Sequence, residues 1–325
     1  MVNWGILATG KIARSFARDL ALVPDAQAVA VGSRRAESAA AFATEFGIAR
    51  AHASYEALVA DEEVDVVYVA SPHALHLAHV RLALEAGKHV LCEKPVALDR
   101  ADAEEMIALA TERGLFFMEA MWMATHPVVR EVARRLRAGE LGTPRHLHAE
   151  LGFVVDADPD DRLLDPALGA SALLDMGIYP LTLAHLALGE AEELTGVATL
   201  SDRGIDLDCA VTGRYPGGAL ATMTASMTSW SERSGRIATD RGLVELEPPF
   251  HHPARAVFHP IEGDPVTIEG EEPVIGAGYG NEIVEVGRCL AAGLLESPLV
   301  PHEQTLTLMA QMDDLRGRLG VTFPG

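Results

Sequence analysis

The strongest constraint on the fold is the alternation of strand and helix patterns from Trp4 to Met121. Short apolar runs alternate there with stretches of helical character. The apolar runs cover residues 4–7, 28–31, 64–69, 90–92 and 115–118, and the helical stretches cover 12–20, 37–46, 75–85 and 101–112. Such alternation is typical of βαβ units around a parallel sheet. We therefore predict an α/β domain with a doubly wound sheet over residues 1–122.

The second half of the chain has a different pattern. Strand-like segments follow one another with few helices between them, at residues 145–155, 194–200, 208–215, 219–228 and 236–247. Helical patterns cover 127–136, 281–292 and 302–319. This order predicts an α+β domain over 123–325 with a large, mostly antiparallel open sheet. We expect its last helix to pack back on the first domain.

Composition excludes several classes of partner. The formal net charge of −21 would repel a nucleic-acid phosphate backbone, so we expect no nucleic-acid partner. The three cysteines, Cys92, Cys209 and Cys289, are scattered, which argues against a disulfide framework or a zinc site. No apolar run predicts a membrane span, and Met1 leads directly into a strand with no signal peptide. These features predict a cytoplasmic protein that binds no membrane and no metal.

A turn containing Gly10 follows the first strand. A dinucleotide fold needs a tight turn there, a bare backbone near the pyrophosphate and a small residue where helix meets strand. The pattern is A-x-G-x-x-A, with Ala8 in place of the usual first glycine. The predicted cofactor contacts in this turn are Ala8, Thr9, Gly10, Lys11 and Ile12. The alternative is a glycine turn that binds no nucleotide.

Ser33, Arg34 and Arg35 stand at the end of the second predicted strand. An NAD site places an acid near this point to hold the ribose 2′-hydroxyl, and here the first acid is Glu37. Ser33 can donate to a 2′-phosphate, and an arginine can pair with it. The pattern predicts NADP(H) as the preferred cofactor, with NAD(H) possible. The alternative is a basic pair on the surface before a helix.

Lys94 lies at the end of the apolar run Val90–Cys92, between Glu93 and Pro95. Proline holds the preceding residue in an extended conformation, so Lys94 is expected at the strand's carboxyl end, where open α/β sheets bind ligands. The sequence has only three lysines, Lys11, Lys88 and Lys94, among 26 basic residues. A lysine at this point favours a site that needs a compact, proton-exchanging ammonium. The alternative is a lysine that solvates the sheet edge.

Two further segments carry candidate residues. Ser71, Pro72, His73 and His76 follow the third run, and either histidine can meet the cofactor or substrate, or begin a helix with a structural role. Asp175 and Tyr179 are four residues apart, so one helical face can present both. A tyrosine hydroxyl beside an ammonium can act as a general acid and base. A buried core tyrosine is the alternative.

Together these motifs resemble the Gfo/Idh/MocA oxidoreductase family, typified by glucose–fructose oxidoreductase and inositol dehydrogenase. The resemblance covers nearly the whole chain. It is carried by the glycine turn and by three motifs: Glu93-Lys94-Pro95, Asp175-Met176-Gly177-Ile178-Tyr179 and the closing Met312-Asp313-Asp314-Leu315-Arg316. Within the family, the dimeric dihydrodiol dehydrogenases look most similar, and NADP-dependent aldose dehydrogenases are also similar.

The resemblance implies hydride transfer between a nicotinamide and a carbinol carbon of a sugar, polyol or cyclic trans-diol. It implies Lys94 and Tyr179 as the catalytic pair, with Asp175 binding a substrate hydroxyl or orienting Lys94. Trp122 and Phe153 would contact the substrate, Glu93 would contact the cofactor, and His76 would line the pocket. The family also implies a homodimer through the open sheet, and a cis bond before Pro95 is often found.

Other interpretations stay open. A regulator of the same fold could sense NADP(H) without turnover, and an enzyme with a tightly held cofactor could interconvert two sugars. The loop after Phe153 carries acids that could grip hydroxyls or form a solvated acidic loop; they are Asp156, Asp158, Asp160 and Asp161, followed by Arg162. The sequence does not name the substrate.

Overall fold

The computed structural model describes Met1–Val321, and the chain in it divides into two compact units. Unit 1 consists of Met1–Thr125 and Val274–Leu306. Unit 2 consists of His126–Pro273 and the chain from Thr307 onwards. The first boundary lies close to the one expected after residue 122. However, the segment Val274–Leu306, which we expected in the second domain, belongs to unit 1.

Unit 1 is built on a parallel sheet, as predicted. In the described chain its strands have the order β3-β2-β1-β4-β5-β6, and each adjacent pair is parallel. The strands are β1 (Val2–Leu7), β2 (Ala26–Gly32), β3 (Arg50–His52), β4 (Val66–Val69), β5 (His89–Glu93) and β6 (Phe117–Ala120). Every residue of β4 is buried, which is typical of a central parallel strand covered on both faces.

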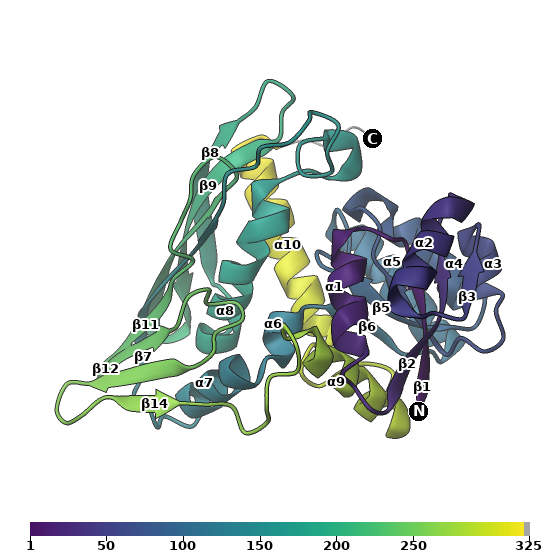
Figure 1. Cartoon of the computed structure of the whole chain (residues 1–325). Coiled ribbons are helices and arrows are strands. Elements are labelled where there is room, and N and C mark those ends of the chain that lie inside the picture. Colours follow the sequence, from purple (N-terminus) through teal and green to yellow (C-terminus); the bar gives the residue numbers. More distant parts are fainter. Residues whose placement is uncertain (322–325) are drawn as a thin grey trace. The chain divides into compact units, whose positions relative to one another are not determined.

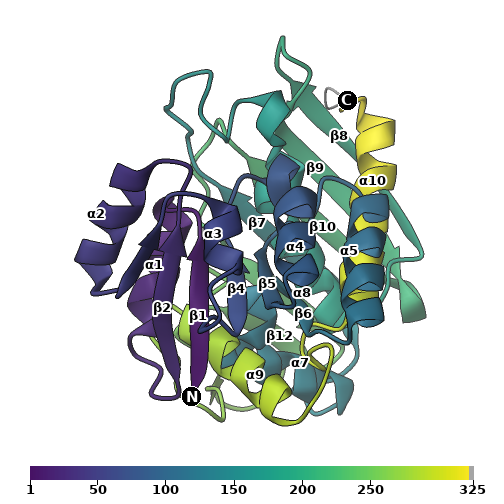
Figure 2. The ribbon, with the colours of Figure 1, turned by 90° about the vertical axis from the view of Figure 1, so that its right-hand side faces the viewer.

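Helices connect these strands on both faces of the sheet. They are α1 (Lys11–Leu20), α2 (Ala36–Phe46), α3 (Tyr55–Val59), α4 (His76–Glu85) and α5 (Arg100–Arg113), with a short 3-10 turn, η1 (His73–Leu75), before α4. Right-handed crossovers place α1 and α2 on one face and α3 to α5 on the other, and α4 and α5 run side by side in Figure 2. The strand order reverses between β1 and β4, which marks the switch point of a doubly wound sheet.

Asp19 explains why Val274–Leu306 belongs to unit 1. This segment contains α9 (Tyr279–Ala291), which packs against α1 and against α6 (Trp122–Thr125). The buried Asp19 carboxylate of α1 accepts hydrogen bonds from the backbone N–H groups of Ala277 at 2.8 Å and Tyr279 at 3.0 Å. It thus caps the start of α9 from a distant helix. Sequence periodicity shows only that α9 is a helix, and gives no sign of this contact.

Unit 2 contains a large, mostly antiparallel sheet, as predicted. In the described residues its order is β14-β13-β12-β11-β7-β10-β9-β8, and only β7 and β10 pair in parallel. The strands are β7 (Pro144–Gly152), β8 (Glu193–Leu200), β9 (Asp206–Tyr215), β10 (Ala219–Ser226), β11 (Gly235–Thr239), β12 (Gly242–Leu246), β13 (Ala256–Pro260) and β14 (Val266–Ile268). The single strand expected at 236–247 is a hairpin, β11–β12.

One face of this sheet is covered and the other is open. α7 (Pro127–Arg137), α8 (Ile178–Leu188) and residues 307–319 of α10 (His302–Leu319) lie on the covered face (Figure 1). Burial alternates strictly along β10, with Ala221 and Met223 buried and Leu220 45% exposed. This alternation is typical of a sheet with one face toward a core.

A segment of unit 2 departs from the expectation that no stretch is apolar enough for a membrane. Among residues 1–321, Pro166–Leu188 is long and apolar enough by composition to cross one. However, 89% of its most apolar window is buried inside the protein. A core helix passes the same test, and this stretch includes α8, which packs on β7 and β10.

Candidate functional site

The turn after β1 combines a strained residue with an open helix end. Ala8 has a φ of 85°, a left-handed conformation that favours glycine, so alanine does occupy the position of the usual first glycine. Gly10 precedes α1, and no side chain within residues 1–321 caps that helix. A Cβ added at Gly10 would meet no heavy atom within 4 Å. The N-terminus of α1, from Lys11 and Ile12, therefore fits the pyrophosphate of a dinucleotide.

The end of β2 carries the two expected arginines on the surface. Arg34 and Arg35 are exposed, and Ser33 is buried, with its hydroxyl accepting from the Arg35 N–H at 3.4 Å. The Arg34 guanidinium lies against the Tyr55 hydroxyl, which was not foreseen from the sequence. This places a cation and an aromatic ring together beyond the strand end, a combination that suits a phosphorylated ribose and its adenine.

His79 extends this group to the turn after β4. Its ring packs edge-on against Tyr55 with centroids 4.7 Å apart, and its Nδ1 lies 2.8 Å from the Ser71 hydroxyl. Burial lowers the pKa of His79, and the nearby Arg34 charge lowers it further. Neither Tyr55 nor His79 was predicted. No helix was expected at residues 55–59, and His79 lies inside the helix expected at 75–85, where nothing in the sequence distinguishes it. Arg34, Tyr55, His79 and Ser71 therefore form one polar row along the carboxyl edge of the sheet.

His76 has the buried position of a structural histidine, one of the two interpretations that the sequence left open. Its side chain is fully buried. Its Nε2 lies 2.8 Å from the Ser71 carbonyl, and its Nδ1 lies 3.0 Å from the Pro95 carbonyl and 3.1 Å from that of Val96. Burial lowers the pKa of His76 to about 4. The ring thus lies between the turn after β4 and the loop after β5. As a neutral imidazole it has one N–H and donates to one of these two sides only.

His73 is also buried. It begins η1, directly after Pro72, and its ring lies beside that of His76. The two imidazole rings are 5.7 Å apart at their centroids and meet edge to face. Pro72 begins the turn with an extended backbone, as expected for a loop at a strand's carboxyl end. His73 thus stands at the same edge of the sheet as Ser71.

Lys94 follows β5 directly, in a loop held by buried side chains. The peptide bond between Lys94 and Pro95 is cis. The Lys94 N–H donates to Glu93 Oε2 at 3.2 Å, and the Tyr68 hydroxyl donates to Glu93 Oε1. Burial raises the pKa of Tyr68, and the Glu93 charge raises it further, so Tyr68 stays a donor. Glu93 thus holds the backbone of Lys94, and its expected contact with the cofactor stays a prediction.

Trp122 begins α6 and is buried in unit 1. Its ring stacks on Tyr279 of α9, with centroids 4.5 Å apart and an interplanar angle of 24°. We expected Trp122 as an apolar wall of the substrate pocket. The stacking partner was not foreseen, because α9 lies far along the chain and was assigned to the other domain.

Asp175 and Tyr179 lie in unit 2, at the junction of a π-helix and α8. The π-helix, η3, spans Leu173–Gly177, and π-turns inside helices are frequent at functional sites. Pro180 follows in the first turn of α8, where proline is tolerated. Asp175 is 7% exposed, and its Oδ1 accepts from the Arg162 guanidinium at 3.2 Å.

Tyr179 is 6% exposed and packs against His251. The two ring centroids are 4.8 Å apart with an interplanar angle of 43°. His251 and its neighbour His252 are half-buried. Their loop follows β12, far along the chain from Tyr179, so sequence spacing does not predict the contact of His251 with the tyrosine. Among residues 1–321, no group of acids, histidines and cysteines is arranged to hold a metal ion.

The loop after β7 contains Phe153 and the acidic run. The Phe153 N–H donates to the Ser226 carbonyl at 3.0 Å, which extends the pairing of β7 with β10 by one residue. Asp156, Asp158 and Asp160 are exposed, which favours the solvated interpretation for these three. Arg162 differs, because it contacts the buried Asp175.

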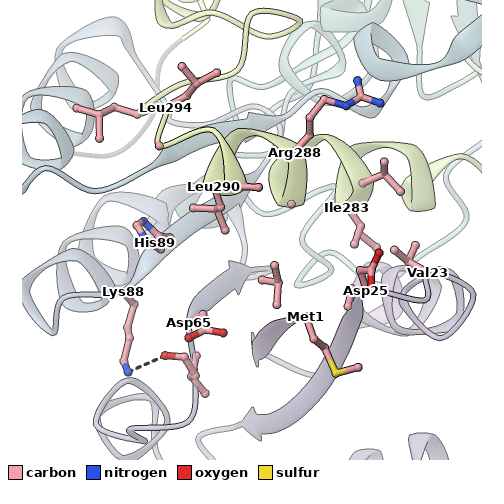
Figure 3. Close-up of a pocket in the computed structure, with 18 of the residues that line it drawn as sticks. Met1, Val23, Asp25, Asp65, Lys88, His89, Ile283, Arg288, Leu290 and Leu294 are labelled. Carbon is pink, nitrogen blue, oxygen red and sulfur yellow. Dashed lines mark hydrogen bonds between the residues drawn. The ribbon is translucent and has the colours of Figure 1, made fainter.

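A groove of about 1120 Å³ lies at the opposite edge of the unit 1 sheet, between the strand N-termini and α9 (Figure 3). Lys88 lines it, and its ammonium donates to the carbonyls of Asp61 at 2.8 Å and Val64 at 2.7 Å. This lysine therefore ties loops together. His89 also lines the groove, and its Nδ1 accepts from the Phe116 N–H at 2.9 Å. The groove lies away from the edge that carries Lys94.

The fold and this site define an NAD(P)-binding oxidoreductase, and the chain belongs to the Gfo/Idh/MocA family. A model described as "Oxidoreductase family, NAD-binding Rossmann fold" matches residues 2–121, and the "GFO/IDH/MocA C-terminal domain" matches residues 129–245. The resemblance noted from the sequence is thereby confirmed.

Particular relatives are similar over the whole chain. The trans-1,2-dihydrobenzene-1,2-diol dehydrogenase of Bos taurus is 34% identical over 334 residues, covering 99% of this chain and 98% of that protein. The structure of KijD10, a 3-ketoreductase from Actinomadura kijaniata in complex with NADP and TDP-benzene, is 27% identical with a TM-score of 0.86, covering 99% of each chain. An aldose-aldose oxidoreductase from Caulobacter crescentus, 24% identical with a TM-score of 0.88 over 98% of this chain and 97% of that chain, shares the fold.

Proposed function

We propose that this protein is an NADP-dependent dehydrogenase that transfers a hydride to or from a carbinol carbon of a sugar, polyol or cyclic trans-diol. The observation that carries the proposal is the loop after β5. At the sheet edge where dinucleotides bind, Tyr68, Glu93 and His76 fix the backbone around Lys94. A lysine that merely solvated the sheet edge would need no such support.

Lys94 and Tyr179 are proposed as the catalytic pair. A bound NADP(H) supplies or accepts the hydride. The Lys94 ammonium hydrogen-bonds the substrate oxygen and favours the ionised form of a nearby phenol. The Tyr179 hydroxyl gives the proton to the carbonyl oxygen during reduction, and the Tyr179 phenolate takes the proton from the carbinol during oxidation. Asp175, paired with Arg162, binds a substrate hydroxyl or orients Lys94, and Trp122 and Phe153 line the pocket.

Two solved structures of KijD10 variants support this assignment. Both a lysine-to-alanine variant and a tyrosine-to-phenylalanine variant of that 3-ketoreductase are among the solved relatives, each with NADP and TDP-benzene. The pairing of these two residue types in a relative matches the pair proposed here.

NADP(H) is the proposed cofactor, with NAD(H) possible. Arg34 and Arg35 stand exposed at the end of β2, beside Ser33, and no acid occupies residues 33–36. The complex of KijD10 with NADP agrees with this choice. The names of these relatives give a cyclic trans-diol as the substrate of the dehydrogenases and a ketone as the group reduced by the 3-ketoreductase, which supports the proposed substrate class.

The assembly is proposed to be a cytoplasmic homodimer through the open face of the unit 2 sheet. That face exposes large apolar side chains, with Val197 71% and Leu220 45% exposed. Light scattering after size exclusion would give the mass of a dimer, and a monomer at micromolar concentration would contradict this part of the proposal.

A panel of sugars, polyols and cyclic diols, followed by NADPH absorbance, tests the function. We expect at least one of these substrates to reduce NADP⁺, and Tyr179→Phe to lower kcat by about 10²–10⁴. Cofactor that binds without turnover of any panel member would favour a nucleotide-sensing regulator. Cofactor that survives gel filtration would favour an enzyme that interconverts two sugars.

A further inference from the structure

Glu119 is a buried carboxylate whose contacts the proposed reaction does not explain. It lies in β6, next to β5, and its side chain is only 3% exposed. Its Oε1 accepts from the Val96 N–H at 3.1 Å, and its Oε2 accepts from the Thr305 hydroxyl at 2.9 Å. Both oxygens are thus engaged, one by the loop that carries Lys94 and the other by the first turns of α10.

Val96 needs this acceptor because its N–H is buried and belongs to no strand. An unpaired backbone N–H inside a protein costs as much as a lost hydrogen bond. The preceding residue, Pro95, has no N–H to offer. Glu119 therefore anchors the backbone N–H of the chain after Lys94, while Glu93 accepts from the N–H of Lys94 itself.

The charges around Glu119 come from a short list of groups. Burial raises the pKa of Glu119 to about 6; the hydrogen bonds from Thr305 and Val96 and the charge of Lys94 lower it, and the charge of Glu93 raises it. The charge of Lys94 is thus one of the interactions that favour the carboxylate form of Glu119. When Glu119 is protonated, Glu93 is the acid that remains next to Lys94 in the loop after β5.

We propose that Glu119 is a positioning residue for Lys94: it anchors the loop after the lysine through Val96, and its buried negative charge attracts the lysine ammonium. This role rests on the proposed function in so far as Lys94 is catalytic. In this proposal the hydrogen bond from Val96 positions the loop, and the negative charge of the carboxylate acts on the lysine. Substitutions can therefore separate the two.

Glu119→Gln removes the charge and keeps an oxygen to accept from Val96. Glu119→Ala removes both. With a substrate from the panel, we expect kcat of E119Q at pH 8 to stay within about threefold of wild type, and kcat of E119A to fall by roughly tenfold, since a buried N–H is left unpaired. The wild-type pH profile should show an inflection near pH 6 that E119Q lacks. Glu104→Gln, on the exposed face of α5, is the matched control and should change neither property.

A second readout is independent of turnover. Because the chain has only three lysines, protein labelled with ¹³Cε-lysine gives three NMR signals, and Lys94→Met assigns one of them. The Lys94 signal should show an inflection near pH 6 that is absent in E119Q. Thr305→Val, which removes a hydrogen bond to the carboxylate, should move this inflection to higher pH.

The two readouts distinguish the possible failures. An inflection that persists unchanged in E119Q, or is absent from the wild-type Lys94 signal, would overturn the proposal for Glu119. A panel without any turnover would overturn the proposed function, while the NMR titration would still decide whether Glu119 holds its charge beside Lys94. Equal kcat values for E119A and E119Q would show that the Val96 contact does not position the lysine.

Discussion

Ala8 shows how one residue can depart from a nucleotide-binding pattern without changing the turn. The backbone adopts the left-handed conformation that the pattern requires, with a φ of 85°, although alanine carries a Cβ. Such a conformation costs an L-residue about 1–2 kcal/mol. The turn is kept because the Ala8 N–H donates to the Gly32 carbonyl at 3.0 Å, which ties the end of β1 to β2.

Ala8→Gly should therefore stabilise the protein. We expect the free energy of unfolding to rise by about 1 kcal/mol, because glycine adopts this conformation without the Cβ strain and loses only part of the gain to chain entropy. Urea titration measures this. Ala13→Gly, in the buried interior of α1, is the control and should destabilise. A lower stability of Ala8→Gly would show that the turn is not strained.

His76 gives the protein a predictable response to acid. Its pKa in the folded state is lowered by burial from 6.5 to about 4, so the unfolded chain binds more protons between these values. Its contribution of ~3 kcal/mol is present above pH 6.5 and is lost as the pH falls toward 4.

His76→Asn removes this titration. We expect the loss of stability between pH 7 and pH 4.5 to be smaller in His76→Asn than in wild type, as measured by urea unfolding at each pH. The neutral His126, whose pKa is also lowered by burial to about 4, remains in the variant and accounts for a residual slope. Identical slopes in the two proteins would contradict the buried, neutral state of His76.

At the scale of elements, the sequence predicts long periodic segments and misses short polar ones. β4 and α10 were predicted from their apolar pattern. β3 (Arg50–His52) was missed because three polar or small residues at a sheet edge carry no periodicity. α3 was missed because its five residues are too few to show one. The hairpin of β11 and β12 was predicted as one strand, because the residues between the two strands, Asp240 and Arg241, include no glycine or proline to mark a turn. The next glycine, Gly242, already lies in β12.

The residues of the candidate site likewise fall into those that the sequence predicts and those that it does not. Residues at strand ends, such as Gly10, Arg34 and Lys94, are predictable because parallel strands bring their carboxyl ends to one edge. Tyr55, His79 and Glu119 are not, because their roles depend on which elements become neighbours. The position of His76 between two turns likewise cannot be read from spacing, which is why the sequence left open both a pocket residue and a structural histidine.

The end of β2 makes the choice of cofactor testable. Arg34→Ala together with Arg35→Ala should weaken NADP⁺ binding by about tenfold to a hundredfold, since a charge-assisted bond to a phosphate is worth about 1.5–3 kcal/mol. NAD⁺ binding, which offers no 2′-phosphate, should change far less. Titration calorimetry with both cofactors measures the two affinities. Equal losses for NADP⁺ and NAD⁺ would show that these arginines do not recognise the 2′-phosphate.

At the scale of the whole molecule, the two units carry different parts of the proposed chemistry. Unit 1 holds the proposed cofactor residues and Lys94, together with Glu119 and α9. Unit 2 holds Asp175 and Tyr179 at the start of α8, beside a sheet with one open face. The sequence predicts this division of labour. It did not predict that the chain returns to unit 1 through Val274–Leu306, because the contact that holds it there is the capping of α9 by Asp19.

The central claim is that Lys94 assists hydride transfer and is not needed to bind the cofactor. The most direct test is a single-turnover reaction of NADPH carrying deuterium at C4 with the carbonyl form of an active panel substrate. In wild type, deuterium should appear on the product's carbinol carbon. In Lys94→Met, the transfer rate should fall by at least about 10²-fold, while the dissociation constant of NADPH stays within about threefold. Transfer at the wild-type rate in Lys94→Met would contradict the account.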